Sequence, residues 1–391
     1  MPTRPTWVEV SLPNLVHNFS LIRDHVGAHA TVCAVVKCDA YGHGAPQCAR
    51  VLEAAGAKWF GVTCADEGIE LRRAGVNARV LLMSGIWRGE AEAAVEYNLT
   101  PAVWNAEQIA ALNSAAEKLG KSSVPVHIEV DTGMSRQGVQ PHGLALLLEA
   151  ARRAKAVCIE GVHSHLASAE VVDAADVEDQ IASYQHALEQ LAAAELRPAC
   201  LHLANSAAIV AHGESWSSLV QNGKTQTALV RPGIALYGYS LPFVTAAGAS
   251  SPIAELPLRP VLAWKTRIVD IREVGAGQGI GYNRAHVTSA PAKIATLAVG
   301  YGDGLNRGLS NRGQLLVRGQ LSPILGKVSM DVTTIDVTQI PGCDVGDEVV
   351  LIGKQREQEL TAWSMARMLD TIPYELLCAI GKRVSRVFLS Q

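Results

Sequence analysis

Short apolar runs alternate with Ala- and Leu-rich helical segments through the first 240 residues of the chain. Strands that alternate with helices pair in parallel, and eight such units within roughly 250 residues match a (β/α)8 barrel. An open doubly wound sheet is the alternative, but no Gly-x-Gly-x-x-Gly sequence follows the first expected strand. The expected strands are 31–37, 59–63, 79–83, 99–103, 125–130, 157–163, 200–204 and 228–231.

The pattern changes near residue 250, after the Pro-rich segment SSPIAELPLRP, which is typical of a linker. Beyond this segment, strand-like runs follow one another between Gly-rich turns, which predicts a mostly β second domain. We therefore expect a barrel domain at 1–250 and a β-rich domain at 251–391. The expected elements of the second domain are strands at 261–274, 292–299, 314–318, 323–328, 332–337 and 347–352, and a helix at 360–370.

The composition is that of a globular protein, and we expect a cytoplasmic one. Hydrophobic residues make up 48% and the formal net charge is -3, so neither nucleic acid nor a membrane is an expected partner. No apolar run is long enough to span a bilayer, and the first residues lack the apolar stretch of a signal peptide. The eight cysteines include no Cys-x-x-Cys pair, which predicts a reducing compartment without a disulfide framework or zinc site.

The ends of the expected barrel strands hold the candidate chemistry, because barrel active sites form at the carboxyl ends of the strands. The first strand ends at Lys37, the seventh is followed by Ser206, and the eighth ends at Arg231 just before Gly233. A hydroxyl at a helix start and the amides after strand eight are typical of phosphate binding. Together with a lysine, they suggest pyridoxal 5'-phosphate held as a Schiff base.

Each of these signals also has an ordinary interpretation. Lysines at strand ends are usually solvated, Ser206 could be an N-cap only, and Gly233 could mark a turn. His163 and His165 lie two residues apart, so an extended strand places both rings on one face. Such a pair could ligate a metal ion, but no third ligand has suitable spacing, and we expect no metal. The position of these residues on one barrel face is what favours a cofactor site.

Seven motifs in this order closely resemble the alanine racemases: AVVKCDAYGHG, DTGMSRQG, HLANSAA, RPGIALYG, GYGDG, VSMD and IPYEL. The first motif, which places a lysine and a tyrosine four residues apart, is the most specific, and the likeness covers nearly the whole chain. The resemblance implies a pyridoxal-phosphate barrel joined to a β domain. It also implies a head-to-tail homodimer with shared active sites.

The resemblance assigns the two bases and the phosphate contacts. Lys37 would be the Schiff-base lysine, and Tyr282 of the motif GIGYNRA would be the second base, reaching into the site of the partner subunit. Outside this family, Tyr282 would be interpreted as an aromatic residue at a strand edge. The residues that would hold the phosphate are Tyr41, Ser206, Gly233, Ile234 and Tyr374.

The resemblance also assigns the cofactor ring and the substrate contacts. Arg231 would face the pyridine nitrogen, His165 would lie against the ring, and Arg136 would bond the phenolic oxygen. Arg136 and Met330 would help bind the substrate carboxylate. Two further residues would line the entrance: Tyr301 and Asp331.

Racemisation explains why these residue types are needed. The α-hydrogen must leave one face and a proton must return to the other, so two opposed groups are required. Lysine titrates near ~10.4 and tyrosine near ~10, so both Lys37 and Tyr282 need neighbours that lower their pKa values. Because a guanidinium does not give up its proton, Arg231 cannot readily protonate the pyridine nitrogen, which favours racemisation over transamination.

One position departs from the family pattern. Many relatives have a carbamylated lysine two residues before the aspartate of DTGM, whereas this chain has Glu129. We expect the carboxylate to take the place of the carbamate and to orient Arg136. The alternative is a strand carboxylate without a role.

The leading hypothesis is an alanine racemase that supplies D-alanine for the bacterial cell wall. A broader or serine-preferring racemase is the alternative of the same reaction type. A non-catalytic pyridoxal-phosphate carrier, a decarboxylase of the same barrel type and a barrel enzyme without this cofactor are the others. GIGYNRA and IPYEL count against the carrier and the decarboxylase.

Overall fold

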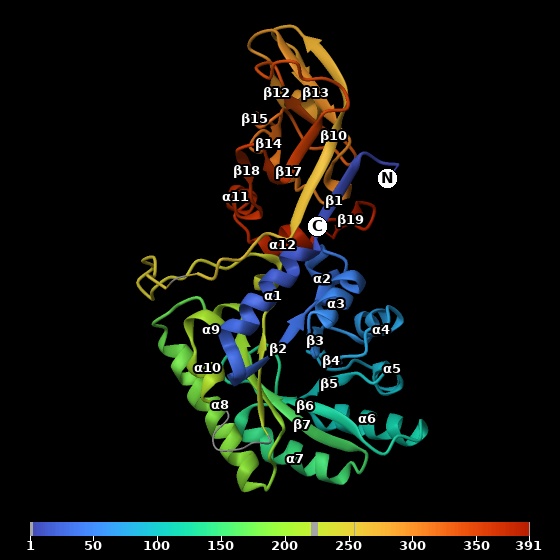
Figure 1. Cartoon of the computed structure of the whole chain (residues 1–391), viewed down its shortest axis with the longest axis vertical. Helices are drawn as coiled ribbons and strands as arrows, with labels where there is room; N and C mark the ends of the chain where they lie inside the picture. Colours follow the sequence, from blue (N-terminus) through green and yellow to red (C-terminus); the bar gives the residue numbers. More distant parts are fainter. Residues whose placement is uncertain (1–2, 220–225, 254, 391) are drawn as a thin grey trace. The chain divides into compact units, whose positions relative to one another are not determined.

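The computed structural model describes residues 3–219, 226–253 and 255–390. The chain divides into two compact units, and Figure 1 shows the order of their elements. The barrel unit comprises Leu15–Ala40 and Ala45–Arg259, and the β unit comprises Met1–Asn14, Tyr41–Gly44 and Pro260–Gln391. The expected domains at 1–250 and 251–391 remain a proposal. The units differ from them by grouping the first strand of the chain with the β-rich part.

Eight parallel strands close into the barrel, and β9 pairs with β2 through Ala30 and Ala228. This confirms the predicted fold class. Their apolar, β-branched sequences suit strands that are buried on both faces. The barrel strands are β2 (Ala30–Val35), β3 (Trp59–Val62), β4 (Arg79–Leu82), β5 (Thr100–Val103), β6 (Val124–Glu129), β7 (Val157–His163), β8 (Cys200–Asn205) and β9 (Thr227–Arg231).

Helices surround the barrel strands, as Figure 1 shows. The longest buries Val177, Ile181 and Tyr184, which are spaced three and four residues apart and therefore share one helical face. The helices of this part of the chain are α1 (Leu12–Val26), α3 (Ala45–Ala54), α4 (Ala65–Arg73), α5 (Glu90–Glu96), α6 (Ala106–Lys118), α7 (Leu144–Arg153), α8 (Ala175–Ala193), α9 (Ser206–Ala211) and α10 (Glu214–Ser217).

The barrel interior has an apolar and a polar part. One buried cluster combines side chains from β2, β3, β4, β8 and β9, so it lies inside the closed sheet: Cys33, Trp59, Leu81, Cys200 and Leu229. Beside it, β6 to β9 contribute the buried polar residues His127, His163, His202 and Arg231. Because buried polar groups need partners, these side chains must bond to one another or to the backbone.

The β unit is built on a sheet in the order β15-β14-β17-β10-β1-β19, and β13 joins β10 to β16. The long strand β10 pairs with β1 near the start of the chain, and β1 pairs in turn with β19 near its end. The elements are β1 (Thr6–Ser11), β10 (Leu262–Val274), β11 (Gly279–Ile280), β12 (His286–Val287), β13 (Ala292–Leu297), β14 (Gln314–Val317), β15 (Gln320–Pro323), β16 (Thr333–Asp336), β17 (Glu348–Gln355), β18 (Gln358–Leu360), α11 (Ala362–Met368), α12 (Pro373–Cys378) and β19 (Ser385–Leu389).

The predicted linker SSPIAELPLRP has neither helix nor strand in its described part, and residue 254 lies outside the described residues. No helix in the described ranges combines the length and apolarity needed to cross a bilayer.

Candidate active site

Lys37 lies at the start of an unusual turn beyond β2. The predicted strand 31–37 ends earlier, at Val35, and Lys37 opens the segment α2 (Lys37–Gly42). Four consecutive residues of this segment have φ values of 53° or 54°, which is left-handed: Cys38, Asp39, Ala40 and Tyr41. Such a backbone costs about 1–2 kcal/mol per residue for non-glycine residues, and strain of this kind is concentrated at functional sites.

Side chains of the barrel unit hold this turn in place. The Asp39 carboxylate accepts a hydrogen bond from the backbone N–H of Ala45 at 2.8 Å. The Glu67 carboxylate accepts one from the N–H of Cys38 at 2.6 Å. The backbone that carries Lys37 is therefore fixed at the carboxyl end of β2, where barrel enzymes place their chemistry.

Ser206 and the segment after β9 form a candidate phosphate site. Asn205 caps α9 and so sets the position of Ser206, the first residue of that helix. The Ser206 hydroxyl accepts hydrogen bonds from the N–H groups of Gly233 at 2.9 Å and Ala235 at 3.4 Å. Two backbone donors thus converge on one oxygen, and a phosphate oxygen is the acceptor such donors suit. The buried Ile234 lies between them in the chain.

Arg231 is buried and its guanidinium is bonded on several sides. It donates to Nδ1 of His202 at 2.8 Å, to the carbonyl of Ser164 at 2.6 Å and to the carbonyl of Leu203 at 3.2 Å. It also donates to Nδ1 of His165 at 3.4 Å. Burial lowers the pKa of Arg231, but a guanidinium stays charged in proteins. The structure therefore presents a fixed positive charge at the barrel mouth.

His165 is a neutral ring in this environment. Burial lowers its pKa well below the ordinary value, and the positive charges of Arg231, Arg136 and Lys37 lower it further. These three cations are thus gathered around His165, as predicted. His163, by contrast, lies inside the barrel. Its ring stacks on that of His202 with centroids 4.7 Å apart, so His163 and His165 do not form a pair.

The expected contact between Glu129 and Arg136 is not formed. The Glu129 carboxylate accepts a hydrogen bond from the Gln137 amide at 2.8 Å and lies 3.5 Å from Nε2 of His163. Among the residues that the structure describes, neither a hydrogen bond nor an ion pair joins Glu129 to Arg136. The reason is that Gln137, one residue further along the loop, bridges Glu129 to the carbonyl of Met83 at 3.1 Å.

The Glu129 carboxylate is ionised near neutral pH. Burial raises its pKa, but the contacts with His163 and Gln137 outweigh burial, so the pKa is lowered overall. Arg136 itself is exposed and lines the same pocket as Glu129 and His165. The pocket therefore keeps the arginine beside the ring of His165 without a bond to the carboxylate.

The remaining predicted site residues lie in the β unit. Tyr282 begins a short turn, η4 (Tyr282–Arg284), and 68% of its side chain is exposed. The rings of Tyr41 and Tyr374 lie 6.0 Å apart. In the loop that carries the other three, the N–H of Tyr301 donates to the carbonyl of Ser329 at 2.9 Å, next to Met330 and Asp331.

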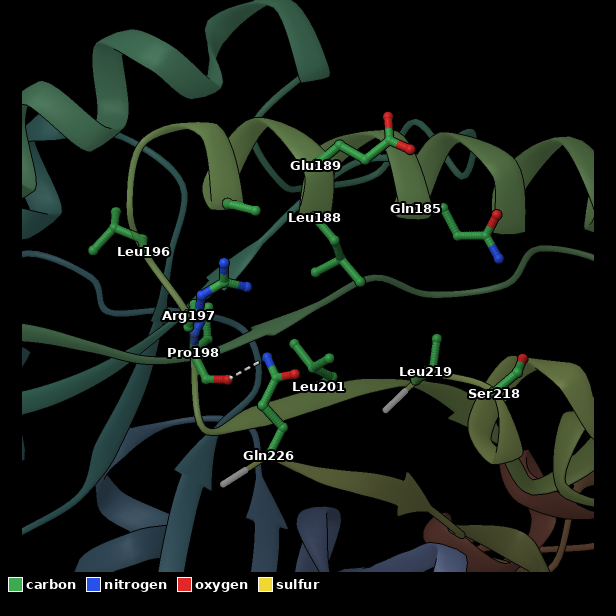
Figure 2. Close-up of a pocket in the computed structure, with 11 residues that line it drawn as sticks. Gln185, Leu188, Glu189, Leu196, Arg197, Pro198, Leu201, Ser218, Leu219 and Gln226 are labelled. Carbon is green, nitrogen blue, oxygen red and sulfur yellow. Dashed lines mark hydrogen bonds between the residues drawn. The ribbon is translucent and has the colours of Figure 1, made fainter. Parts of the chain in front are cut away.

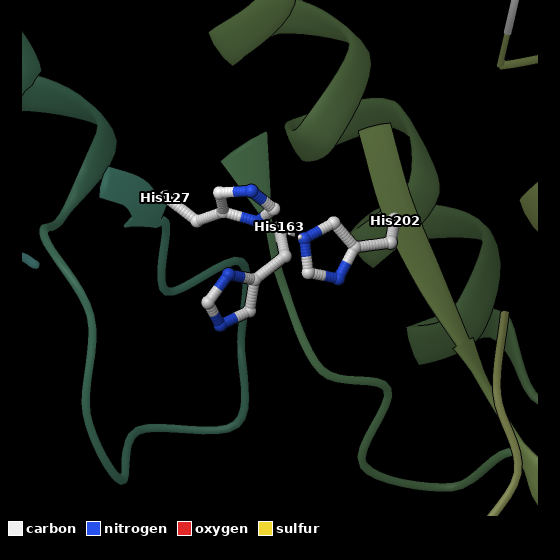
Figure 3. Close-up of side chains that lie close together, drawn as sticks. All are labelled: His127, His163 and His202. Atoms are coloured by element: carbon white, nitrogen blue, oxygen red, sulfur yellow. Dashed lines mark hydrogen bonds between the residues drawn. The ribbon is translucent and has the colours of Figure 1, made fainter. Parts of the chain in front are cut away.

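The sequence interpretation missed several residues of the site. His127 and His202 each interrupt an apolar strand run, and they lie buried with His163 inside the barrel, as Figure 3 shows. A single histidine within a buried strand was the available signal. Gln137 was also missed, because nothing in the sequence indicates that its amide turns toward Glu129.

A second pocket lies on the outside of the barrel, between α8 and the segments around β8 and β9 (Figure 2). Gln226 donates to the carbonyl of Pro198 across it at 3.0 Å. None of the described residues that line this pocket is a predicted site residue.

Profiles of known families match both parts of the chain. The profile "Alanine racemase, N-terminal domain" matches residues 10–241, and "Alanine racemase, C-terminal domain" matches residues 261–388. The chain is 40% identical to an alanine racemase of Halothermothrix orenii over 386 residues, which is 99% of this chain and 97% of the relative.

Solved structures agree with this. The alanine racemase of Clostridium difficile 630 has a TM-score of 0.89 and 32% identity, over 99% of this chain and 96% of that one. The alanine racemase of Bartonella henselae, whose structure has covalently bound pyridoxal phosphate, has a TM-score of 0.82 and 28% identity, over 98% of this chain and 99% of that one.

Proposed function

Because this chain belongs to the alanine racemase family, we propose that it interconverts L-alanine and D-alanine with pyridoxal 5'-phosphate, using Lys37 and Tyr282 as opposed bases. The observation that carries the proposal is the grouping at the barrel mouth. Lys37 contributes its charge to the surroundings of His165, Arg231 donates to His165, and Gly233 donates to Ser206.

The residues of the barrel mouth suit this cofactor. The N–H groups that converge on Ser206 would bond the phosphate, and the fixed charge of Arg231 would face the pyridine nitrogen. When bound, the cofactor would draw electrons from the substrate and make its α-hydrogen acidic. The residues that would hold it are Lys37, Tyr41, Arg136, His165, Ser206, Arg231, Gly233, Ile234 and Tyr374.

Two groups of the chain would move the protons. The Lys37 amine would act on the face of D-alanine, and the Tyr282 phenol on the face of L-alanine. Both groups titrate near pH ~10 in water, so a proton acceptor at neutral pH requires positive charge or hydrogen-bond donors nearby. Arg231, Arg136 and the neutral ring of His165 supply these at the barrel mouth.

Arg231 would set the type of reaction. Since its guanidinium keeps its protons, it would offer the pyridine nitrogen a hydrogen bond but not a full proton. The cofactor would then hold the electron pair of the α-carbon less strongly. Fast return of a proton would follow, which favours racemisation over transamination.

The substrate contacts and the dimer are part of the proposal. Arg136 and Met330 would bind the alanine carboxylate, and Tyr301 and Asp331 would line the entrance. A homodimer in which Tyr282 reaches the barrel of the partner subunit is supported by exposure, because 68% of Tyr282, 53% of Met330 and 43% of Tyr301 is accessible in the single chain. A second copy would cover these side chains.

The product would serve cell-wall synthesis in the cytoplasm. The eight cysteines are all free thiols, which supports a reducing compartment. Glu129 is proposed to act through His163 and Gln137, and not by direct contact with Arg136.

The proposal is tested with the purified protein and added pyridoxal 5'-phosphate. L-alanine should lose its optical activity, L-serine should react much more slowly, and borohydride should fix the cofactor on the peptide that contains Lys37. Faster reaction with serine would make the chain a serine-preferring racemase. Bound cofactor without turnover of either amino acid would support a non-catalytic carrier and overturn the proposal.

A further inference from the structure

A row of hydrogen bonds runs beneath Arg231 through the barrel interior. Nδ1 of His202 lies 2.8 Å from Nη1 of Arg231. Nε2 of the same ring lies 2.8 Å from Nδ1 of His127. Nε2 of His127 lies 3.5 Å from the carboxylate of Glu160, which is paired with Arg79. Figure 3 shows the His127 and His202 rings together with that of His163.

The protons in this row have only one consistent arrangement. A guanidinium only donates, so Nδ1 of His202 must accept, and its Nε2 must therefore carry the hydrogen. That hydrogen is donated to Nδ1 of His127, so Nε2 of His127 also carries one and directs it to Glu160. Every donor thus points away from Arg231 and toward Glu160. Both imidazoles are neutral and fixed in the same tautomer.

The charges at the two ends enforce this arrangement. Burial lowers the pKa of His127 to about 4, and Glu160 raises it only in part. Burial also lowers the pKa of His202 well below its ordinary value, and His163, Arg231 and His127 lower it further. Burial raises the pKa of Glu160, but His127 and Arg79 outweigh it and bring the value to about 2.

The barrel is shaped to accept this row. A Cβ atom at residue 161 would lie 2.5 Å from Nδ1 of His127, so Gly161 on the neighbouring strand leaves space for the ring. Arg79 donates to Thr100 as well as to Glu160, and its guanidinium lies 4.6 Å from the ring of Trp59. The far end of the row is therefore as firmly held as Arg231.

We propose that His127 and Glu160 are positioning residues for Arg231, joined to it through His202 in one directed row of hydrogen bonds. The row holds the guanidinium at one orientation, where the pyridine nitrogen of the cofactor is proposed to lie. This inference rests on the proposed function for its catalytic consequence. Its structural content, two neutral rings with hydrogen on Nε2, stands independently of that function.

A metal ion at the three histidines is the competing interpretation. Ligand atoms of His127, His163 and His202 lie within 4.8 Å of one another. However, both nitrogens of His202 already have partners, and the positive charges of Arg231 and Arg79 lie at the two ends of the row. A cation would have to break the row and would be repelled from both sides.

The test combines ring 15N spectra of the full chain with kinetics. In the wild-type protein, with and without added pyridoxal 5'-phosphate, His127 and His202 should both carry hydrogen on Nε2 and stay neutral between pH 6 and pH 8. Equimolar Zn²⁺ should leave these signals in place. Hydrogen on Nδ1 of either ring, a protonated ring, or a zinc-induced shift of all three histidines would overturn the proposal, and none of these readouts requires racemase activity.

Variants then test the catalytic consequence. Glu160→Gln and His127→Phe should lower kcat by about tenfold, the effect of losing one buried hydrogen bond, with little change in the KM for alanine. The share of turnovers that end in transamination should rise. His127→Asn, whose amide oxygen can replace Nδ1 as the acceptor, should recover most of the rate.

Two exposed side chains of α8 provide matched controls, Glu189→Gln and His186→Asn, and both should behave as the wild type. If Glu160→Gln and His127→Phe match these controls in kcat and in the share of transamination, the positioning role is wrong even when the wild type racemises alanine. If a variant fails to fold, the wild-type spectra still decide the arrangement of protons.

Discussion

The Glu129 carboxylate accepts a hydrogen bond from the amide of Gln137, at 2.8 Å, and not from the guanidinium of Arg136. This contact lies where many relatives are expected to have a carbamate that orients the arginine. The structure instead leaves Arg136 exposed at the edge of the pocket.

The first prediction follows from this contact. Because Glu129 does not hold Arg136, Glu129→Gln should change the KM for alanine by less than about threefold, whereas Arg136→Ala should raise it by about tenfold or more. Steady-state kinetics of the two variants provide the comparison. Equal increases in KM would mean that Glu129 orients the arginine after all.

Acid should destabilise the protein from about pH 6.5 downward. Burial lowers the pKa of His127 from its ordinary value of 6.5 to about 4, so the folded state binds fewer protons than the unfolded state between these values. The stabilising contribution is therefore complete above pH 6.5 and is lost as the pH falls toward 4. For His127 alone it is about 3 kcal/mol.

Urea unfolding at several pH values measures this loss. The pKa values of His163, His165 and His202 are lowered in the same direction, so the decline should be steep. A free energy of unfolding that stays constant between pH 7.5 and pH 5 would show that these rings are protonated in the folded protein.

Ser206→Ala should weaken cofactor binding. The hydroxyl organises the N–H groups of Gly233 and Ala235, and its loss removes one contact to the phosphate, so affinity should fall by about tenfold. Titration of the protein with pyridoxal 5'-phosphate measures this. Ser218→Ala, whose hydroxyl bonds the carbonyl of Glu214 on α10, should bind as the wild type. An unchanged affinity of Ser206→Ala would place the phosphate elsewhere.

Glycine should be tolerated in the left-handed turn after Lys37. Cys38 is exposed and has a φ of 54°, so Cys38→Gly removes the Cβ strain and should raise the free energy of unfolding by about 0.5 kcal/mol. Cys158→Gly, at an exposed position of β7, should instead lower it by about 1 kcal/mol. Thermal unfolding of the two variants gives the comparison, and equal losses would contradict a strained turn.

Much of this architecture could be predicted from the sequence because it depends on local patterns. The alternation of strands and helices predicts the barrel, and the predicted strand at 261–274 matches β10 closely. The strand β1 was missed although TWVEVS alternates in burial, because its partner β10 lies far along the chain. A local pattern indicates a strand but not the sheet to which it belongs.

The candidate site shows the same limit. Strand ends identify Lys37, Ser206 and Arg231, since their positions follow from topology alone. The partners of Glu129 could not be predicted, because two adjacent loop residues, Arg136 and Gln137, compete for one carboxylate and only the loop conformation decides between them. The assignment of Tyr282 as a base depended on the family resemblance, because one exposed tyrosine carries no such signal.

The most direct test of the account mixes two inactive variants, Lys37→Ala and Tyr282→Phe, under conditions in which subunits exchange. If each active site combines Lys37 of one chain with Tyr282 of the other, heterodimers contain one intact site, and alanine racemase activity should return toward about a quarter of the wild-type value at equal mixing. Exchange is verified with subunits that carry different tags. No recovery of activity despite verified exchange would contradict the shared site.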